Sequence, residues 1–205
     1  MISPPQLLLA PLLLLLLLLL TPLVAASEDY YQSPSAFRAA VLKTHNRYRA
    51  EHGAVPALKW SSAAASYAQG VADRCKWSHS GGKYGENLAA GHQDVASAVT
   101  DWGDERKDYN WGNPGWNPQA GHFTAIVWKS SSSVGCAAKK CAHIDGAGFG
   151  GWFFVCEYWT PGNVMGQFKQ NVLPYKKGRR WMGSPASMAG STAKRDAEAE
   201  GEEDR

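Results

Sequence analysis

His122 is the first residue that could carry chemistry, because it stands immediately before a run that alternates like a half-buried β-strand, "HFTAIVW". Successive side chains of a strand point to opposite faces, so Thr124, Ile126 and Trp128 would share a face with the histidine. A strand would therefore aim the imidazole in a fixed direction. A lone histidine at a strand end is more often structural than a ligand, so a site here needs partners from elsewhere in the chain.

Glu105 is a second candidate. A helix is predicted to start near Asp94, and one of its faces carries four apolar residues, Val95, Ala98, Val99 and Trp102. Three residues further along the same stripe lies Glu105. The helix macrodipole disfavours a carboxylate near the C-terminus of a helix, and an unpaired charge beside a buried face is costly. Glu105 should therefore have a partner.

Aromatic residues are concentrated in the stretch "DYNWGNPGWNPQ", which contains Tyr109, Trp111 and Trp116. Its asparagine, glycine and proline content predicts a loop. Aromatic side chains on an exposed loop form an apolar patch, and such a patch on a soluble protein usually marks a binding site. The alternative is that one or both tryptophans fold back onto the core.

The N-terminus resembles a targeting segment. Leu12 to Leu20 is an unbroken leucine run, followed by "TPLVAA" with its small residues, so residues 1–26 are predicted to be a signal peptide cleaved after Ala26. The apolar stretch is nearly long enough for a membrane anchor, which is the alternative. A signal peptide predicts a secreted, extracellular protein.

All four cysteines, Cys75, Cys136, Cys141 and Cys156, lie in the part of the chain that follows. An even number of cysteines behind a signal peptide favours two disulfides, and spacing alone leaves three pairings open. "CAAKKC" has a four-residue gap and no second close pair, so a zinc cluster is disfavoured.

The rest of the sequence divides into a short linker over 27–34, one domain over 35–175 and a charged tail over 176–205. The domain has 14 lysines or arginines and 10 aspartates or glutamates, a mild and scattered excess that does not suggest a nucleic-acid partner. The tail has too few apolar residues to fold and is predicted to be disordered. Its dibasic pair, Lys194 and Arg195, is a candidate processing site, with an uncleaved tail as the alternative.

Three helices followed by short strands are expected in the domain. The helices cover about 36–52 with Ser35 as N-cap, a segment from Ser61 or Ser62 to Cys75, and the segment from Asp94. "SHSGGKYGENLAAG" is predicted to be a loop. One strand is expected directly after His122, a second around "VGCAAKKC" and a third in "WFFVCEYW". This order indicates an α+β domain with helices stacked on a small sheet. His45 is expected to be hydrogen-bonded structure, and the other histidines of the domain outside the site, such as His52 and His92, to lie in loops or on the surface.

Four stretches in this order closely resemble the signature motifs of the CAP superfamily of cysteine-rich secretory, antigen 5 and pathogenesis-related class 1 proteins. They are "HNRYR", "HSGGKYGENLAAG", "GHFTAIVWKSSSSVGCA" and "FVCEYWTPGNVMGQFKQNV". The resemblance covers about Ser35 to Tyr175. It implies a three-layer α/β/α sandwich with a small central antiparallel sheet, and disulfides Cys75–Cys141 and Cys136–Cys156. A further cysteine pair of plant members is missing here.

The resemblance also implies a cleft lined by His79, Glu86, Glu105 and His122, although Asp104 competes with Glu105 for its place. Two imidazoles and two carboxylates suit a divalent metal such as zinc or magnesium, which the fold would not require. The alternative is a hydrogen-bonded network without metal. The sequence lacks G-x-S-x-G and H-E-x-x-H, and the resemblance does not imply an enzyme.

"DYNWGNPGWNPQAGHFT" looks most like the yeast secreted sterol-binding members, in which a similar aromatic loop is implicated in sterol binding. Tyr109, Trp111 and Trp116 are therefore the expected sterol or lipid contacts of a monomeric carrier that touches membrane surfaces transiently. Such a carrier could act in host interaction or in defence against toxic lipids. A metal-dependent hydrolase or protease and a protein ligand without lipid cargo are the competing hypotheses.

Overall fold

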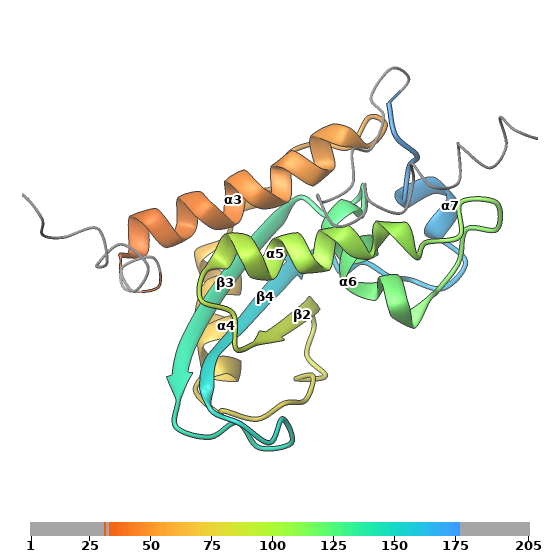
Figure 1. The fold of residues 1–205 in the computed structure, drawn as a ribbon. Coiled ribbons are helices and arrows are strands. Elements are labelled where there is room, and N and C mark those ends of the chain that lie inside the picture. The colour runs from red at the N-terminus through yellow and green to blue at the C-terminus, as the bar shows by residue number, and fades with distance from the viewer. Residues whose placement is uncertain (1–30, 32, 177–205) are drawn as a thin grey trace, which may run out of the picture.

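The computed structural model describes Tyr31 and residues 33–176, arranged as helices on both faces of a four-stranded sheet (Figure 1). The predicted signal peptide, almost all of the tail and the dibasic pair lie outside these residues. The strands are β1 Lys59–Trp60, β2 Gly85–Ala90, β3 Ser133–Cys141 and β4 Gly151–Trp159. The α-helices are α3 Pro34–Glu51, α4 Ser62–Ala72, α5 Val95–Asp104, α6 Gly121–Val127 and α7 Phe168–Asn171. Short 3₁₀ turns, Glu105–Lys107 and Pro118–Ala120, precede α6.

The sheet has the order β1-β3-β4-β2. β4 pairs antiparallel with both β3 and β2, and the two-residue β1 runs parallel to β3. One apolar cluster, which includes Val41, Val99, Phe123 and Phe154, lies between the sheet and the α3, α5 and α6 layer. A second, which includes Ala68, Val71 and Val155, lies under α4. The predicted three-layer sandwich is confirmed.

Helix caps explain where two of the helices begin. The Ser61 hydroxyl accepts from the backbone N–H of Ala64 at 3.2 Å, and the Asp94 carboxylate accepts from that of Ser97 at 2.8 Å. Both side chains satisfy amides that a first helical turn leaves unpaired. The first long helix starts two residues earlier than predicted, with Ser33 as N-cap and Pro34 in the first turn.

The layers approach closely at one glycine. A Cβ on Gly135 of β3 would lie 2.1 Å from the backbone nitrogen of Ala65 in α4. The backbone of α4 therefore crosses β3 at a distance that no other residue allows.

Two predictions of secondary structure are wrong. The segment after His122 belongs to the helix α6 and is not a strand. The alternation of side chains was misleading because all five residues from Phe123 to Val127 are buried, so the helix has no exposed face here that would show a helical period. "SHSGGKYGENLAAG" is not all loop, because Gly85–Ala90 pairs with six residues of β4. That pairing depends on residues far away in the chain.

Both disulfides have the partners that the family resemblance implies. Cys75 is bonded to Cys141 and Cys136 to Cys156. The second joins adjacent residues of β3 and β4, and the first ties the end of the α4 segment to the end of β3. Within the described residues, no helix is long and apolar enough to cross a membrane.

Candidate functional site

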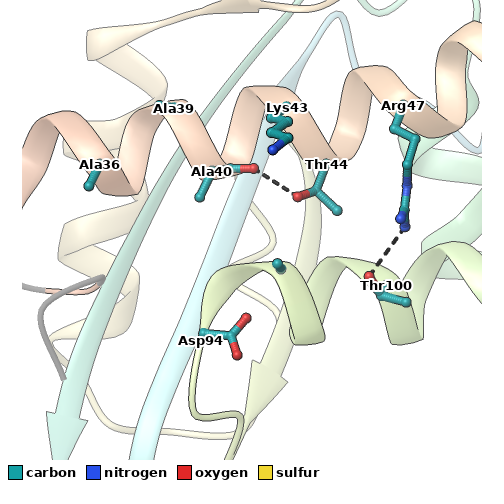
Figure 2. Close-up of a pocket in the computed structure, with 9 residues that line it drawn as sticks. Ala36, Ala39, Ala40, Lys43, Thr44, Arg47, Asp94 and Thr100 are labelled. Carbon is teal, nitrogen blue, oxygen red and sulfur yellow. Dashed lines mark hydrogen bonds between the residues drawn. The ribbon is translucent and has the colours of Figure 1, made fainter. Parts of the chain in front are cut away.

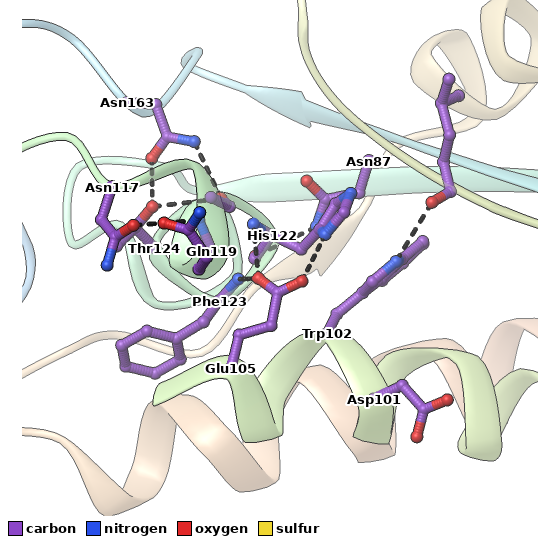
Figure 3. A network of polar contacts seen from close by, with 12 residues as sticks. Asn87, Asp101, Trp102, Glu105, Asn117, Gln119, His122, Phe123, Thr124 and Asn163 are labelled. Carbon is purple, nitrogen blue, oxygen red and sulfur yellow. Dashed lines mark hydrogen bonds and ion pairs between the residues drawn. The ribbon is translucent and has the colours of Figure 1, made fainter. Parts of the chain in front are cut away.

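His122 and Glu105 form one histidine–carboxylate pair, at the start of α6 (Figure 3). His122 Nδ1 lies 2.6 Å from Glu105 Oε1. The other carboxylate oxygen accepts from the backbone N–H groups of His122 at 3.0 Å and Phe123 at 3.2 Å. Glu105 therefore has the predicted partner and also caps α6. Asp104, its competitor, instead accepts from the Tyr48 hydroxyl at 2.9 Å.

Two further contacts hold His122, one to its ring and one to its backbone. Its ring stacks on Trp102 at 5.7 Å between centroids, with 21° between the ring planes. The Asn87 side chain donates to the His122 carbonyl at 3.1 Å and to the Tyr158 hydroxyl at 3.1 Å. Asn87 belongs to β2, so this contact links the sheet to α6 (Figure 3). A helix start, a helix end and a strand together fix the orientation of His122.

His79 and Glu86 form the second pair, beside β2. His79 Nδ1 lies 2.7 Å from Glu86 Oε1, which also accepts from the backbone N–H of Ser80 at 2.9 Å. The His79 side chain is 64% exposed and the Glu86 side chain only 6%. Although burial raises the pKa of Glu86, its hydrogen bonds with His79, Ser80 and Glu157 outweigh that and hold the pKa well below its usual range. The hydrogen bond to Glu86 raises the pKa of His79 despite partial burial.

Glu157 is a residue of this site that the sequence analysis missed. It lies on β4 directly opposite Glu86 on β2 and is fully buried. Burial, the hydrogen bond with Glu86 and the charge of Glu86 all raise the pKa of Glu157. Neither of its oxygens pairs with any other described donor. A buried carboxyl group beside a second carboxylate favours its neutral form, and the acidic residue inside the apolar run "WFFVCEYW" was the signal that could have revealed it.

The four predicted metal ligands form two pairs. In each pair Nδ1 faces a carboxylate, which leaves Nε2 as the possible ligand atom, and such carboxylate-oriented histidines are common at zinc. Among the described residues, however, no three histidine, cysteine, aspartate or glutamate side chains are grouped so that they could hold a metal ion. The arrangement does not constitute one ligand set, and metal binding stays a prediction.

The aromatic loop divides into a buried part and an exposed part. Tyr109 is only 4% exposed, and Trp111 stacks on His52 at 5.6 Å with 10° between the rings. Trp111 also contacts Phe123, so the alternative of folding back onto the core holds for this residue. Trp116 is 50% exposed and is the one member of the three that offers an open apolar surface. The expectation of an exposed loop is wrong for Tyr109 and Trp111.

Arg49 of α3 and His52, the C-cap of this helix, connect α3 to the rest of the domain. Arg49 is fully buried and donates to four carbonyls, including those of Ile126 at 2.9 Å and Ser131 at 2.7 Å. His52, expected in a loop or on the surface, is also fully buried and has its Nδ1 2.8 Å from the Leu173 carbonyl oxygen. His45 is hydrogen-bonded structure as predicted, with Nε2 2.9 Å from the Tyr158 hydroxyl. Burial lowers the pKa of both histidines to about 4, so both are neutral.

The surface has several hollows. The largest of three is a groove of about 680 Å³ between α3 and α5 (Figure 2). Alanines line it, but Lys43, Arg47 and Asp94 line it as well. A second, of about 570 Å³, lies beside Arg38 and Trp60, and a third, of about 390 Å³, lies between Trp77 and Phe149. None of these three is lined by the aromatic loop.

The described chain is thus a helix–sheet–helix sandwich that is cross-linked by two disulfides and carries two histidine–glutamate pairs. The sequence pattern of the cysteine-rich secretory protein family, CAP, matches residues 42–158, and the chain belongs to this family.

Two relatives agree with this assignment, and a solved structure is similar in fold. The chain is 43% identical to "Protein PRY2" of Saccharomyces cerevisiae over 67% of this chain and 41% of that protein. It is 42% identical to "Secreted protein PRY1" of Candida albicans over 68% of this chain and 33% of that protein. The chain thus spans less than half the length of these two relatives. The structure of NaASP2 with Zn²⁺ is similar in fold, with a TM-score of 0.57 at 20% identity over 70% of this chain and 87% of that chain.

Proposed function

We propose that this protein is a secreted carrier that binds a sterol or a related lipid outside the cell. The observation that carries the proposal is a set of large apolar side chains that the described domain leaves exposed to water. Five of them gather in two places, Trp77 with Phe149 and Trp116 with Val164 and Met165, and are exposed between 39% and 72%. Exposed apolar surface of this kind marks a site for an apolar ligand or a membrane.

Three of these side chains lie on neighbouring loops and suit contact with a lipid surface. The Asn163 amide donates to the Gly121 carbonyl at 2.9 Å, and the Trp116 ring lies against Phe168. These contacts place Trp116 beside the loop that carries Val164 and Met165. A carrier that extracts a lipid must touch a membrane briefly, and this loop pair supplies the apolar surface for that contact. Kinship with fungal proteins named as secreted supports action outside the cell.

A binding protein is favoured over a metal-dependent hydrolase by the state of the histidine pairs. Both Glu86 and Glu105 are engaged by backbone N–H groups as well as by imidazoles, as expected of carboxylates that stabilise structure. Hydrolysis would need a metal-activated water or a nucleophile beside a base. We therefore assign the pairs no catalytic step.

Lipid retention by the purified protein tests the proposal. Protein secreted by its native host is extracted with organic solvent and the extract is analysed by mass spectrometry, and the delipidated protein is titrated with labelled ergosterol and cholesterol. We expect a co-purifying lipid and saturable sterol binding that persists in a chelator. No bound lipid and no sterol binding would overturn the carrier function and favour a protein ligand, whereas a hydrolytic activity lost on chelation would favour the enzyme.

A further inference from the structure

The third hollow, which we call the Trp77–Phe149 pocket, has a volume of about 390 Å³. Its lining comes from the segment after α4, the end of β2, α5 and the loop between β3 and β4. The lining residues are Trp77, Leu88, Ala89, Ala90, His92, Trp102, Gly146, Ala147 and Phe149. Trp77 is 42% exposed and Phe149 47%, whereas Trp102 is almost completely buried. Two aromatic side chains thus flank an opening with an aromatic residue below it.

Backbone contacts hold the pocket open without a ligand. The Trp77 N–H donates to the Asp145 carbonyl at 2.7 Å, and the Asp145 N–H donates to the Cys75 carbonyl at 2.8 Å. The Cys75–Cys141 disulfide anchors both segments at the same place. Within the loop, the Ile144 N–H donates to the Phe149 carbonyl at 2.9 Å. The disulfide and these hydrogen bonds therefore hold the segments that carry the two aromatic side chains, so ligand binding would lose little free energy in ordering them.

The chemistry of the lining is almost entirely apolar. Eight of the nine lining residues are apolar or glycine, and His92 is the exception. The indole N–H of Trp102 already donates to the Leu88 carbonyl at 3.2 Å, so a ligand need not supply an acceptor for it. His92 Nε2 lies 2.8 Å from Asp101, and its Nδ1 has no partner among the described residues. The pocket suits a ligand with a broad apolar body and one polar group.

The groove between α3 and α5 is larger but differs in this respect. Lys43, Arg47 and Asp94 line it, and the Arg47 guanidinium donates to the Thr100 hydroxyl at 3.3 Å (Figure 2). Charged side chains at its wall would have to give up water for a ligand that offers no hydrogen bonds. The smaller pocket does not impose this cost.

We propose that the Trp77–Phe149 pocket is the sterol site of this protein and holds part of the fused-ring body between the two aromatic side chains. This inference rests on the proposed function and names its location. A sterol has a rigid apolar ring system and a single hydroxyl, which matches a lining with one polar side chain. Ligand pockets of 300–1,000 Å³ are usual for small molecules, so the volume admits much of the ring system, with the remainder projecting through the opening.

Equilibrium binding of a fluorescent or radiolabelled ergosterol to the full secreted protein tests the site. Trp77→Ala and Phe149→Ala each remove one wall, and Ala147→Leu fills the pocket while keeping both walls. We expect each variant to bind at least about tenfold more weakly, because each removes or blocks a substantial apolar contact. Both aromatic residues are about half exposed, so truncation should leave thermal unfolding nearly unchanged, and this is measured for every variant.

Two matched controls separate the pocket from the rest of the surface. Trp159→Ala removes a tryptophan that is 44% exposed but does not line the pocket, and it should bind sterol like wild type. Trp116→Ala tests the aromatic loop. If only Trp116→Ala weakens binding, the carrier function stands and the pocket assignment is overturned. If wild type binds no sterol, both fail.

Discussion

The His122–Glu105 and His79–Glu86 pairs use the same hydrogen bond, from Nδ1 to a carboxylate oxygen at 2.6 and 2.7 Å, in different surroundings. Glu105 accepts two backbone N–H groups at the start of α6, and its imidazole stacks on Trp102. Glu86 accepts one backbone N–H group and meets a second, buried carboxyl group, while its imidazole is mostly in water. Glu105 therefore orders the backbone at the start of α6, whereas Glu86 mainly shifts the pKa values of His79 and Glu157.

This comparison explains why similar residues have different expected roles. Removing Glu105 leaves helix amides without an acceptor, so the effect should appear in stability. Removing or neutralising groups around Glu86 changes the pKa values of the neighbouring His79 and Glu157, so the effect should appear in the pH dependence of stability. A ligand or metal at either pair would bind beside a carboxylate that already accepts backbone hydrogen bonds.

The largest expected effect is the loss of stability in Glu105→Ala. The backbone N–H groups of His122 and Phe123 and the imidazole all lose their acceptor, and unmade hydrogen bonds of this kind cost about 3 kcal/mol together. Urea unfolding monitored by tryptophan fluorescence measures it. Asp101→Ala is the control, since Asp101 is 73% exposed and has only His92 as an ion-pair partner in the described part of the chain, and it should change stability by less than about 0.5 kcal/mol. Equal stabilities of the two variants would show that Glu105 does not organise α6.

The next effect concerns Glu157→Gln and depends on pH. The raised pKa of Glu157 means that the folded protein keeps a proton that the unfolded chain releases above the usual pKa of a glutamate. Wild-type stability should therefore fall as pH rises above about 4.5, the ordinary value, towards the raised pKa. Glutamine cannot ionise, so the variant should gain on the order of 2 kcal/mol over wild type at pH 8 and little at pH 4.

Unfolding of wild type and Glu157→Gln in urea at several pH values decides this. Glu157→Leu is a useful second variant, because it is also neutral but places no polar group opposite Glu86. If the stability difference between wild type and Glu157→Gln does not change with pH, Glu157 is not the proton-holding member of the pair.

Local signals in the sequence predicted part of this structure. Ser61 and Asp94 act as caps within three residues of themselves, so the starts of α4 and α5 could be predicted without tertiary information. The residues of both pairs came from the family motifs and from the stripe that ends at Glu105. The disulfide partners also came from the family, because spacing alone left three pairings open.

The features that were missed depend on distant partners. Burial on all sides removed the helical period from α6, so His122 was placed on a strand. Glu157 faces Glu86 only because β2 and β4 pair in a particular register. Trp111 leaves the exposed loop because His52, about sixty residues earlier in the chain, lies buried beneath it. Each outcome requires a contact that no local window contains.

A smaller effect concerns metal. We propose that zinc binds weakly through the free Nε2 of one or both imidazoles, with the carboxylates orienting the rings. His122→Ala should then lower zinc affinity by about tenfold in calorimetry at pH 7.5, and wild-type affinity should fall at acid pH, because only a neutral imidazole can bind zinc. His79→Ala shows whether the two pairs act together. Equal losses in both variants would mean that a bound metal draws the pairs into one site, whereas unchanged affinity in both would exclude them as ligands.

The smallest effect is on the ionisation of His79. It tests most directly whether Glu86 acts through its charge or through its hydrogen bond to the backbone. The hydrogen bond to Glu86 is the leading cause of the raised pKa of His79, so Glu86→Gln should bring that pKa down towards the ordinary value for histidine. A folded-state pKa above the unfolded one contributes stability below the unfolded value, and that contribution disappears as pH rises through the folded value. The Glu86→Gln variant should lose this slope near neutral pH, although the effect is small because His79 is 64% exposed and screened by water. Titration of the His79 ring proton by NMR follows the change, with His143 as an exposed reference on another loop. A His79 titration that Glu86→Gln leaves unmoved would mean that Glu86, like Glu105, mainly organises backbone, and the contrast between the two pairs would then be lost.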